Sequence, residues 1–366
     1  MRSAPSQVEA LSRIGADDII EALGLGELRS GRGLLEQLCM WPARRIARQL
    51  AACDRAIGEH GLSEGAVWIV QQFAGRLEVA GQEQLPTEGP LLITANHPGL
   101  TDVAALCATL PRSDVRIVAA EYPLLRALHR TSRHLIYVPE QAHDRPLAVR
   151  EAAHHLRGGG AVLLFPAGRI EPDPAVLPGA VRSLDGWSKS IGLLVRLANR
   201  TRVVPAVISG VLSASAQRHP FTRLRRRQPD RQRLASLLQA LVPGYQGVAV
   251  QVAFGPPLAA EDLLAAGEDV AGISRKVVAH ARALIERPPT SWRTLVVRPR
   301  SARSQCPPSG GPGLRTGGGS KEVLHADLQT REKGSPRPSS QRAVKSSARK
   351  IERPSSVGGP GSQGSP

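Results

Sequence analysis

Hydrophobic residues recur at three- and four-residue intervals along residues 7–74. This period is typical of amphipathic helices, and it predicts helices over Gln7–Leu23 and Leu34–His60 with glycines between them. Residues 34–50 combine apolar positions with several arginines, and Pro42 is expected to kink this helix or to begin a new one. Such a helix can lie on an anionic membrane, or it can pack on the domain behind it, which is the interpretation that we favour.

From about residue 76 the pattern changes to short apolar runs separated by helical segments. We expect strands at 77–79, 91–94, 115–119, 135–138, 161–165, 203–208 and 247–254. Helices are expected at about 101–110, 123–131, 145–157, 184–199, 231–242 and 268–286. Strands that alternate with helices predict an α/β domain, in which helices flank a mostly parallel sheet.

Composition divides the chain into three parts. An N-terminal helical region covers 1–74, and the α/β domain covers 75–290 with its motifs concentrated in 91–215. Residues 300–366 are rich in Gly, Ser, Pro, Arg and Lys, and they offer too little apolar surface to offset the entropy of the chain. We therefore expect a disordered basic tail.

The net charge of +17 is high for a chain of 366 residues. From Arg298 to the end there are 13 Lys and Arg against 4 Asp and Glu, a balance of +9, so the remainder of the chain carries +8. This surplus indicates anionic partners such as phosphates or acidic lipid headgroups, although a general preference for Arg at the surface explains it as well. The arginine-rich stretch 218–233 can hold the phosphates of coenzyme A, the acidic face of an acyl-carrier protein or anionic lipid, or it is a solvated loop.

Two absences narrow the class of protein. The four cysteines have no CxxC spacing, which predicts reduced thiols in the cytoplasm, without a disulfide framework or a metal site. We find no signal peptide and no run of 18 apolar residues, so we expect a cytoplasmic protein whose contact with the inner face of the membrane is peripheral. A nucleic-acid-binding protein would explain the charge, but the basic tail has no aromatic residue for base stacking and the α/β pattern would stay unexplained.

The strongest candidate for chemistry is the turn between the apolar run at 91–95 and the helix expected from Thr101. Its sequence is Asn96-His97-Pro98-Gly99-Leu100-Thr101-Asp102. A turn of this length can bring His97 and Asp102 together, so that the carboxylate fixes the imidazole tautomer, although Asp102 can equally be a helix cap. No Gly-x-Ser-x-Gly accompanies the pair. The pair suits direct transfer, in which His97 takes the proton of a hydroxyl that attacks an acyl thioester and amides at the start of the helix stabilise the oxyanion.

The surrounding residues resemble the first motif of the glycerolipid acyltransferase family, the group of lysophosphatidic acid and glycerol-3-phosphate acyltransferases. Phe165-Pro166-Ala167-Gly168-Arg169-Ile170-Glu171 resembles the family's Phe-Pro-Glu-Gly-Thr-Arg-Ser block, and residues 203–207 resemble its last motif. The resemblance implies transfer of a fatty acyl group from acyl-CoA or acyl-carrier protein to a glycerophosphate or lysophospholipid-like acceptor, with no further cofactor and no metal. It implies His97 as general base and Asp102 as its orienting acid.

The same resemblance suggests which residues contact the substrates, with some departures from the family pattern. The implied substrate-binding residues are Asn96, Gly99, Phe165, Pro166, Gly168, Arg169, Glu171 and Arg145. The family's Glu is replaced by Ala167, its Arg is one residue early at Arg169, and Glu171 is a candidate replacement for the missing carboxylate. Arg169 can instead pair with Glu171 or Asp173. Arg145 is one of several arginines that can replace the family's second-motif Arg. These changes leave the acceptor open and allow a catalytically degenerate, lipid-binding homologue as an alternative.

Overall fold

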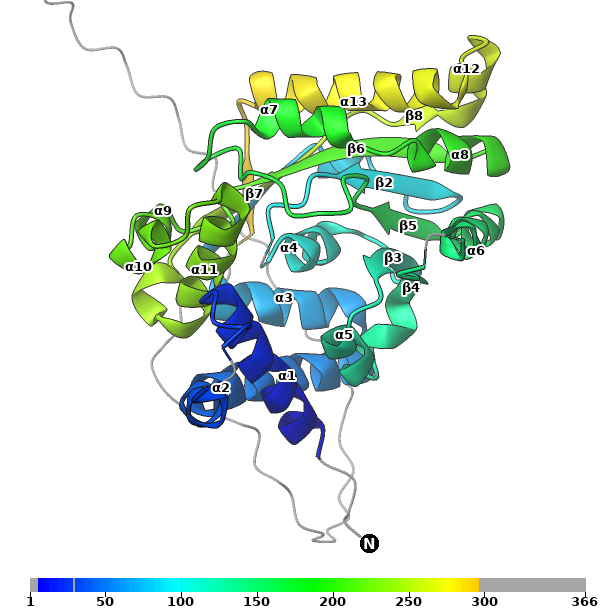
Figure 1. The fold of residues 1–366 in the computed structure, drawn as a ribbon. Coiled ribbons are helices and arrows are strands. Elements are labelled where there is room, and N and C mark those ends of the chain that lie inside the picture. The colour runs from blue at the N-terminus through cyan, green and yellow to red at the C-terminus, as the bar shows by residue number, and fades with distance from the viewer. Residues whose placement is uncertain (1–5, 29, 100, 142, 296–366) are drawn as a thin grey trace, which may run out of the picture. The chain divides into compact units, whose positions relative to one another are not determined.

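The computed structural model describes residues 6–28, 30–99, 101–141 and 143–295, and a nine-stranded sheet runs through this part of the chain (Figure 1). By its internal contacts the chain divides into two units, 1–303 and 304–366, and the second lies outside the described residues. The disordered tail expected at 300–366 therefore also lies outside the described residues.

The sheet is mostly parallel, as predicted. Its strands are β1 (Arg76–Ala80), β2 (Leu91–Ala95), β3 (Val115–Ala120), β4 (Leu135–Val138), β5 (Ala161–Leu164), β6 (Arg202–Ser209), β7 (Ala249–Phe254), β8 (Leu258–Ala259) and β9 (Arg293–Leu295). They lie in the order β4-β3-β5-β2-β6-β7-β1-β9, with β8 paired to β6. The first five of this order are parallel, whereas β7 is antiparallel to β6 and β9 to β1. Strand β2 lies in the middle, and all five of its residues are buried.

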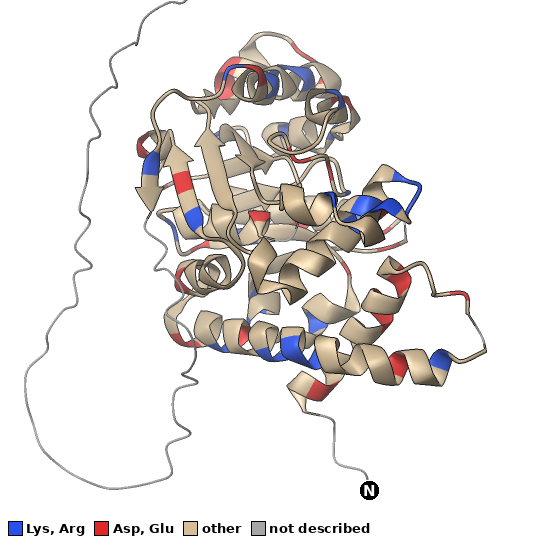
Figure 2. Cartoon of the chain, turned by 90° about the vertical axis from the view of Figure 1, so that its left-hand side faces the viewer, with Lys and Arg blue, Asp and Glu red and all other residues tan. Residues whose placement is uncertain are grey.

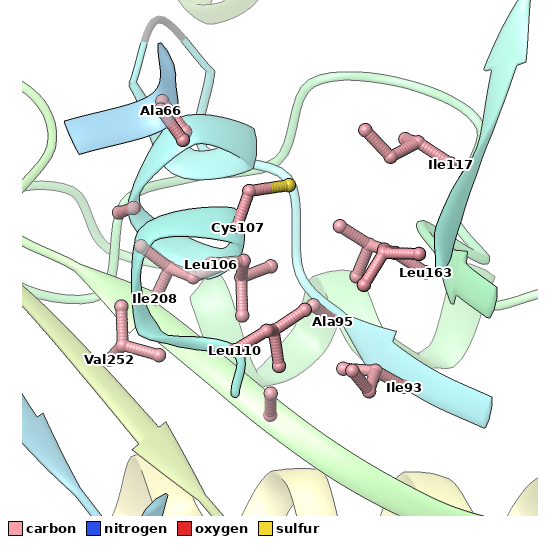
Figure 3. Packing of buried hydrophobic residues seen from close by; sticks show 14 of the residues in the cluster. Ala66, Ile93, Ala95, Leu106, Cys107, Leu110, Ile117, Leu163, Ile208 and Val252 are labelled. Carbon is pink, nitrogen blue, oxygen red and sulfur yellow. The ribbon is translucent and has the colours of Figure 1, made fainter. Parts of the chain in front are cut away.

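Helices cover both faces of the sheet and enclose two hydrophobic cores. The first face is covered by α3 (Leu62–Phe73) and α4 (Asp102–Thr109), and the second by α6 (Arg145–Arg157), α8 (Ser190–Leu197) and α13 (Val270–Glu286) (Figure 1). Alternation along β2 serves both cores, because Leu91 and Ile93 belong to the first and Leu92 to the second. Figure 3 shows Leu106 and Cys107 of α4 packed in the first core with Ile93.

The N-terminal helices are α1 (Gln7–Ala22) and α2 (Arg32–His60), which pack on each other. Helix α2 continues through Pro42, so the alternative that a new helix begins there is wrong. The carboxylate of Asp54 in α2 is fully buried, and it accepts hydrogen bonds from the Gln7 side chain and from the backbone amides of Arg130 and Thr131. These bonds join both helices to the chain that precedes β4.

The elements differ from the predicted ones chiefly where the chain changes direction. The helix expected at 184–199 is instead α7 (Ala180–Ser183), a 3-10 turn at Leu184–Gly186 and α8, because Trp187 adopts an extended conformation between them. The helix expected at 123–131 ends early, as α5 (Pro123–Ala127), and a 3-10 turn, η2 (Thr131–His134), follows where Asp54 binds the backbone.

Several short elements were not predicted. They are η1 (Gln82–Gln84), α9 (Ala214–Gln217), α10 (Pro220–Arg223), η4 (Pro243–Tyr245), α12 (Ala260–Ala265), β8 and β9. Helix α11 (Gln228–Leu241) begins earlier than the expected helix at 231–242. Within the described ranges, no helix combines the length and apolarity needed to cross a bilayer.

Candidate active site

The turn that follows β2 and the loop that follows β5 meet at one edge of the sheet. The two strands are parallel neighbours, and Thr94 of β2 lies opposite Leu164 of β5. Their carboxyl ends are therefore side by side, as is usual for sites in α/β proteins. This register places His97 against Phe165, with the centres of the two rings 4.7 Å apart.

His97 and Asp102 form the hydrogen-bonded pair that the sequence predicts. Nδ1 of His97 lies 2.7 Å from Oδ2 of Asp102. The same carboxylate accepts the amide of Gly99 at 2.7 Å on Oδ2 and the amide of Val103 at 2.6 Å on Oδ1. Because an acceptor-only carboxylate requires the proton on Nδ1, the other ring nitrogen, Nε2, carries the lone pair. No hydrogen bond joins Nε2 to any residue that the structure describes, and the His97 side chain is 28% exposed.

The surroundings of His97 make it a stronger base than an ordinary histidine. Burial by itself would lower the pKa of His97, because it disfavours the charged imidazolium. The negative charge of Asp102 and its hydrogen bond outweigh burial, and the charge of Glu171 adds to them, so the pKa of His97 is raised above its usual value.

The sharp turn depends on Gly99, whose φ of 97° lies in the left-handed region. A Cβ at this position would lie 3.2 Å from Cδ1 of Ile170. The amides of Gly99 and Val103 are bonded to Asp102, and that of Thr101 to the Gly99 carbonyl at 2.9 Å. These three amides already have acceptors, so the expectation that amides at the start of α4 stabilise an oxyanion is wrong for them.

Glu171 lies behind the turn rather than facing solvent. The side chain is buried, and its Oε2 accepts the backbone amide of His97 at 3.0 Å, while the Glu171 amide donates to the His97 carbonyl at 2.8 Å. The indole of Trp187 donates to Oε1 at 3.1 Å. Burial raises the pKa of the Glu171 carboxyl, although these hydrogen bonds and one from Ser183 partly oppose the effect. Glu171 is thus placed to hold the histidine backbone instead of reaching a substrate.

Sequence reasoning missed Gln232 and Trp187, which complete this arrangement. Gln232 is buried in α11, and its Nε2 donates to the carbonyls of Pro98 at 2.9 Å and Glu171 at 2.8 Å. Trp187 comes from the break before α8. Neither residue belongs to a local motif, and Gln232 is 134 positions from Pro98, so no spacing signal could have identified it.

The predicted substrate-binding residues fall into two groups. Asn96 is buried, and its amide both donates to the Ile208 carbonyl at 2.9 Å and accepts the Ile208 amide at 2.7 Å. Pro166 is also buried, and its carbonyl accepts the amide of Ser188. Asn96, Gly99, Pro166 and Glu171 therefore use their polar groups inside the protein, to shape the site.

The second group is accessible from outside. Gly168 and Arg169 are exposed beyond Phe165, and a Cβ on Gly186 would lie 3.0 Å from a guanidinium nitrogen of Arg169. Arg169 forms no ion pair with any described residue, and the alternative pairing with Glu171 or Asp173 is wrong because both carboxylates are buried among other donors. Arg145 is exposed at the start of α6. It follows β4, the third strand from β2 in the sheet, and its guanidinium donates to the Glu140 carbonyl at 3.4 Å rather than contacting the turn that carries His97.

Cysteine does not offer an alternative nucleophile near the pair. Cys107 is fully buried in α4, and burial, together with the charge of Asp102, raises the pKa of its thiol to about 12. Such a thiol is not ionised at neutral pH. The other cysteines of the described part, Cys39 and Cys53, are buried as well.

The part of the chain that carries these residues is similar to a known protein family. The family model described as Acyltransferase matches residues 76–209, which include His97, Asp102 and the loop after β5. A solved structure that the chain resembles is the 1-acyl-sn-glycerophosphate (LPA) acyltransferase PlsC from Thermotoga maritima, with 14% identity and a TM-score of 0.39 over 78% of this chain and 96% of that chain. No curated protein sequence matches the chain. Residues 76–209, with the strands β1 to β6 and the turn that carries His97 and Asp102, are therefore similar to an acyltransferase domain.

Proposed function

We propose that the chain is an O-acyltransferase that moves a fatty acyl group from an acyl thioester to a hydroxyl of a glycerophosphate or lysophospholipid-like acceptor. The observation that carries this proposal is the 2.7 Å contact between His97 Nδ1 and Asp102, which leaves Nε2 free to accept a proton. The match of residues 76–209 to an acyltransferase family supports the reaction class.

In the proposed reaction, Nε2 of His97 removes the proton from the acceptor hydroxyl as its oxygen attacks the thioester carbonyl. The new C–O bond forms while the C–S bond breaks, and the proton held by His97 leaves with the thiolate. Asp102 keeps the imidazole in the correct tautomer and stabilises the imidazolium that forms. The buried and protonated Cys107 supports direct transfer without an acyl-cysteine intermediate.

The acceptor is proposed to be anionic. Arg169 is exposed on the loop that follows β5, four residues after Phe165, and has no carboxylate partner among the described residues, so its guanidinium is available for a phosphate. The donor is proposed to be acyl-CoA or acyl-carrier protein, and both offer the same thioester to His97.

We propose that the protein works in the cytoplasm, peripherally associated with the inner face of the membrane. Helix α2 supports this location. Its buried face packs on α1 through Cys39 and Ala43, while Leu34, Leu38 and Trp41 on another face are 64%, 63% and 74% exposed. An exposed apolar face on an arginine-containing helix is typical of peripheral membrane association.

The test is an assay of free thiol released from acyl-CoA and from acyl-carrier protein, each incubated with glycerol 3-phosphate, lysophosphatidic acid or another lysophospholipid. Mass spectrometry of the products identifies the acceptor. We expect acceptor-dependent thiol release with one new ester per thiol. If no donor and acceptor pair gives an ester, the chain is a lipid-binding homologue and the proposal is wrong.

A further inference from the structure

The segment between β6 and β7 leaves the sheet for almost forty residues, and it lies beyond the range matched by the acyltransferase family. It contains α9, α10, α11 and the arginine-rich stretch 218–233, which has seven arginines and one aspartate. The reaction proposed above uses none of these arginines. Their concentration in one short stretch therefore needs another explanation.

Large apolar side chains are exposed in the same segment. Phe221 in α10 is 58% exposed, and Leu224 directly after it is 75% exposed. Leu23 and Leu28, in the connection after α1, are also exposed. The two segments lie against each other, because a Cβ on Gly24 would overlap the guanidinium of Arg225. Exposed apolar side chains gathered in this way mark a surface that contacts a partner or a membrane.

Three free arginines flank these apolar side chains. Arg223, Arg226 and Arg227 are exposed and form no ion pair with any residue in the described ranges, whereas Arg225 is partly buried and lies 3.3 Å from Asp230. Figure 2 shows Lys and Arg concentrated on the loop and helix at this side of the chain. The acidic residue of this stretch, Asp230 in α11, pairs with Arg225 and leaves the guanidinium groups of Arg223, Arg226 and Arg227 without an ion pair among the described residues.

This surface is joined to the candidate active site by α11. The helix begins directly after Arg227, and one turn later Gln232 donates to the carbonyl of Pro98 beside His97. A flat anionic surface that contacted α10 would therefore lie close to the edge of the sheet where His97 is partly exposed.

We propose that Phe221, Arg223, Leu224, Arg226 and Arg227, here called the α10 corner, dock the enzyme on an anionic lipid bilayer. The two apolar side chains enter the interface, while the three guanidinium groups contact headgroup phosphates. The arginines alone would be enough to bind an acidic protein partner. The exposed Phe221 and Leu224 between them match a membrane interface, where apolar side chains enter the bilayer surface. The proposal rests on the proposed function in one respect, because docking serves catalysis only if the acceptor is a lipid.

The test is sedimentation of the full chain with phosphatidylcholine vesicles that do or do not contain phosphatidylglycerol. Two variants probe the corner, F221S/L224S and R223Q/R226Q/R227Q. The matched controls are L147S, which changes a leucine exposed on α6, and R150Q/R157Q/R200Q, which removes three exposed arginines elsewhere. We expect each corner variant to bind anionic vesicles about tenfold more weakly or worse, and each control to stay within about twofold of the wild type.

Three outcomes would overturn the proposal. Unchanged binding of both corner variants would place any membrane contact elsewhere, as would loss of binding in L34S/W41S alone. The third outcome is that only R223Q/R226Q/R227Q loses vesicle binding, and that the wild type binds an acidic carrier protein whereas this variant does not. This result would indicate a protein partner for the arginines. Vesicle binding needs no turnover, so H97A must bind as the wild type does. Failure of the proposed reaction is therefore measured separately, with acceptor dispersed in detergent.

Discussion

Oδ2 of Asp102 contacts His97 Nδ1 at 2.7 Å, and two backbone amides donate to the same carboxylate, that of Gly99 to Oδ2 and that of Val103 to Oδ1. All three partners donate hydrogen bonds, so an ionised carboxylate, which only accepts, can satisfy them all. A side chain with a donor group of its own, such as asparagine, cannot accept all three hydrogen bonds in the same geometry. The orientation of the imidazole is therefore set by the backbone of the turn that also carries it.

Asp102→Asn should reduce kcat by about three to four orders of magnitude, as loss of the orienting acid does in a Ser-His-Asp triad. The asparagine amide either repels the Gly99 amide or turns the imidazole to the wrong tautomer. The measurement is kcat with saturating donor and acceptor, and circular dichroism shows whether the variant is folded. A loss of less than tenfold in the folded variant would show that Asp102 is only a helix cap.

The pH dependence of kcat/KM should follow the protonation of His97. Only the neutral imidazole accepts a proton, so activity is expected to rise with pH through a single titration, then reach a plateau. Because the pKa of His97 is raised by Asp102, the midpoint should lie above the ordinary histidine value of about 6.5. In Asp102→Asn the residual activity should titrate at lower pH. A midpoint that does not move in this variant would contradict the electrostatic coupling of the two residues.

Gln232→Leu should lower kcat about tenfold and leave KM nearly unchanged. The substitution removes the two hydrogen bonds that hold the carbonyls of Pro98 and Glu171, and it frees the catalytic turn without touching a substrate. Gln239→Leu is the matched control, because Gln239 is also buried in α11 and makes two backbone hydrogen bonds, to Ser213 and Val211. Equal losses of kcat in both variants would mean that Gln232 acts only through general stability.

Arg169→Gln should raise the KM for a phosphate-bearing acceptor about tenfold, while kcat changes little. An acceptor that lacks the phosphate should be used equally by both forms. Arg145→Gln is the control, since Arg145 is also exposed but follows β4, the third strand from β2. If Arg145→Gln raises this KM and Arg169→Gln leaves it unchanged, the acceptor phosphate binds near the start of α6 and not on the loop after β5.

Leu106→Ala should lower the free energy of unfolding by about 2–5 kcal/mol. Leu106 is fully buried in α4, between the sheet and α3, and truncation leaves a cavity in the first core (Figure 3). Urea denaturation measures the change, and Leu147→Ala on the exposed side of α6 should cost much less. A small effect at Leu106 would show that α4 is not fixed against the sheet.

What the sequence could predict was local. The His97–Asp102 pair is five residues apart on one turn, and the buried runs at 91–95 and 161–164 are continuous, so both the pair and the central strands follow from short-range patterns. The remaining parts depend on contacts between distant segments. Gln232 reaches Pro98 only after the chain has folded, and the direction of β7 beside β6 depends on the segment that separates them.

The role of Glu171 shows the same limit. Its position in the block 165–171, which resembles Phe-Pro-Glu-Gly-Thr-Arg-Ser, suggested a carboxylate for substrate binding, but the structure turns it inward, toward the His97 amide and Trp187. Trp187 is 16 residues further along, at a break that helix periodicity did not indicate. A motif can thus place a residue at a site without determining which way its side chain points.

The central claim is that His97 is the base for direct acyl transfer to a hydroxyl. Its most direct test is the rate of acceptor-dependent thiol release by the wild type and by His97→Ala, with circular dichroism to establish that both are folded. We expect rapid release by the wild type only when acceptor is present, and no release above background by His97→Ala. Undiminished thiol release by a folded His97→Ala variant would contradict this claim.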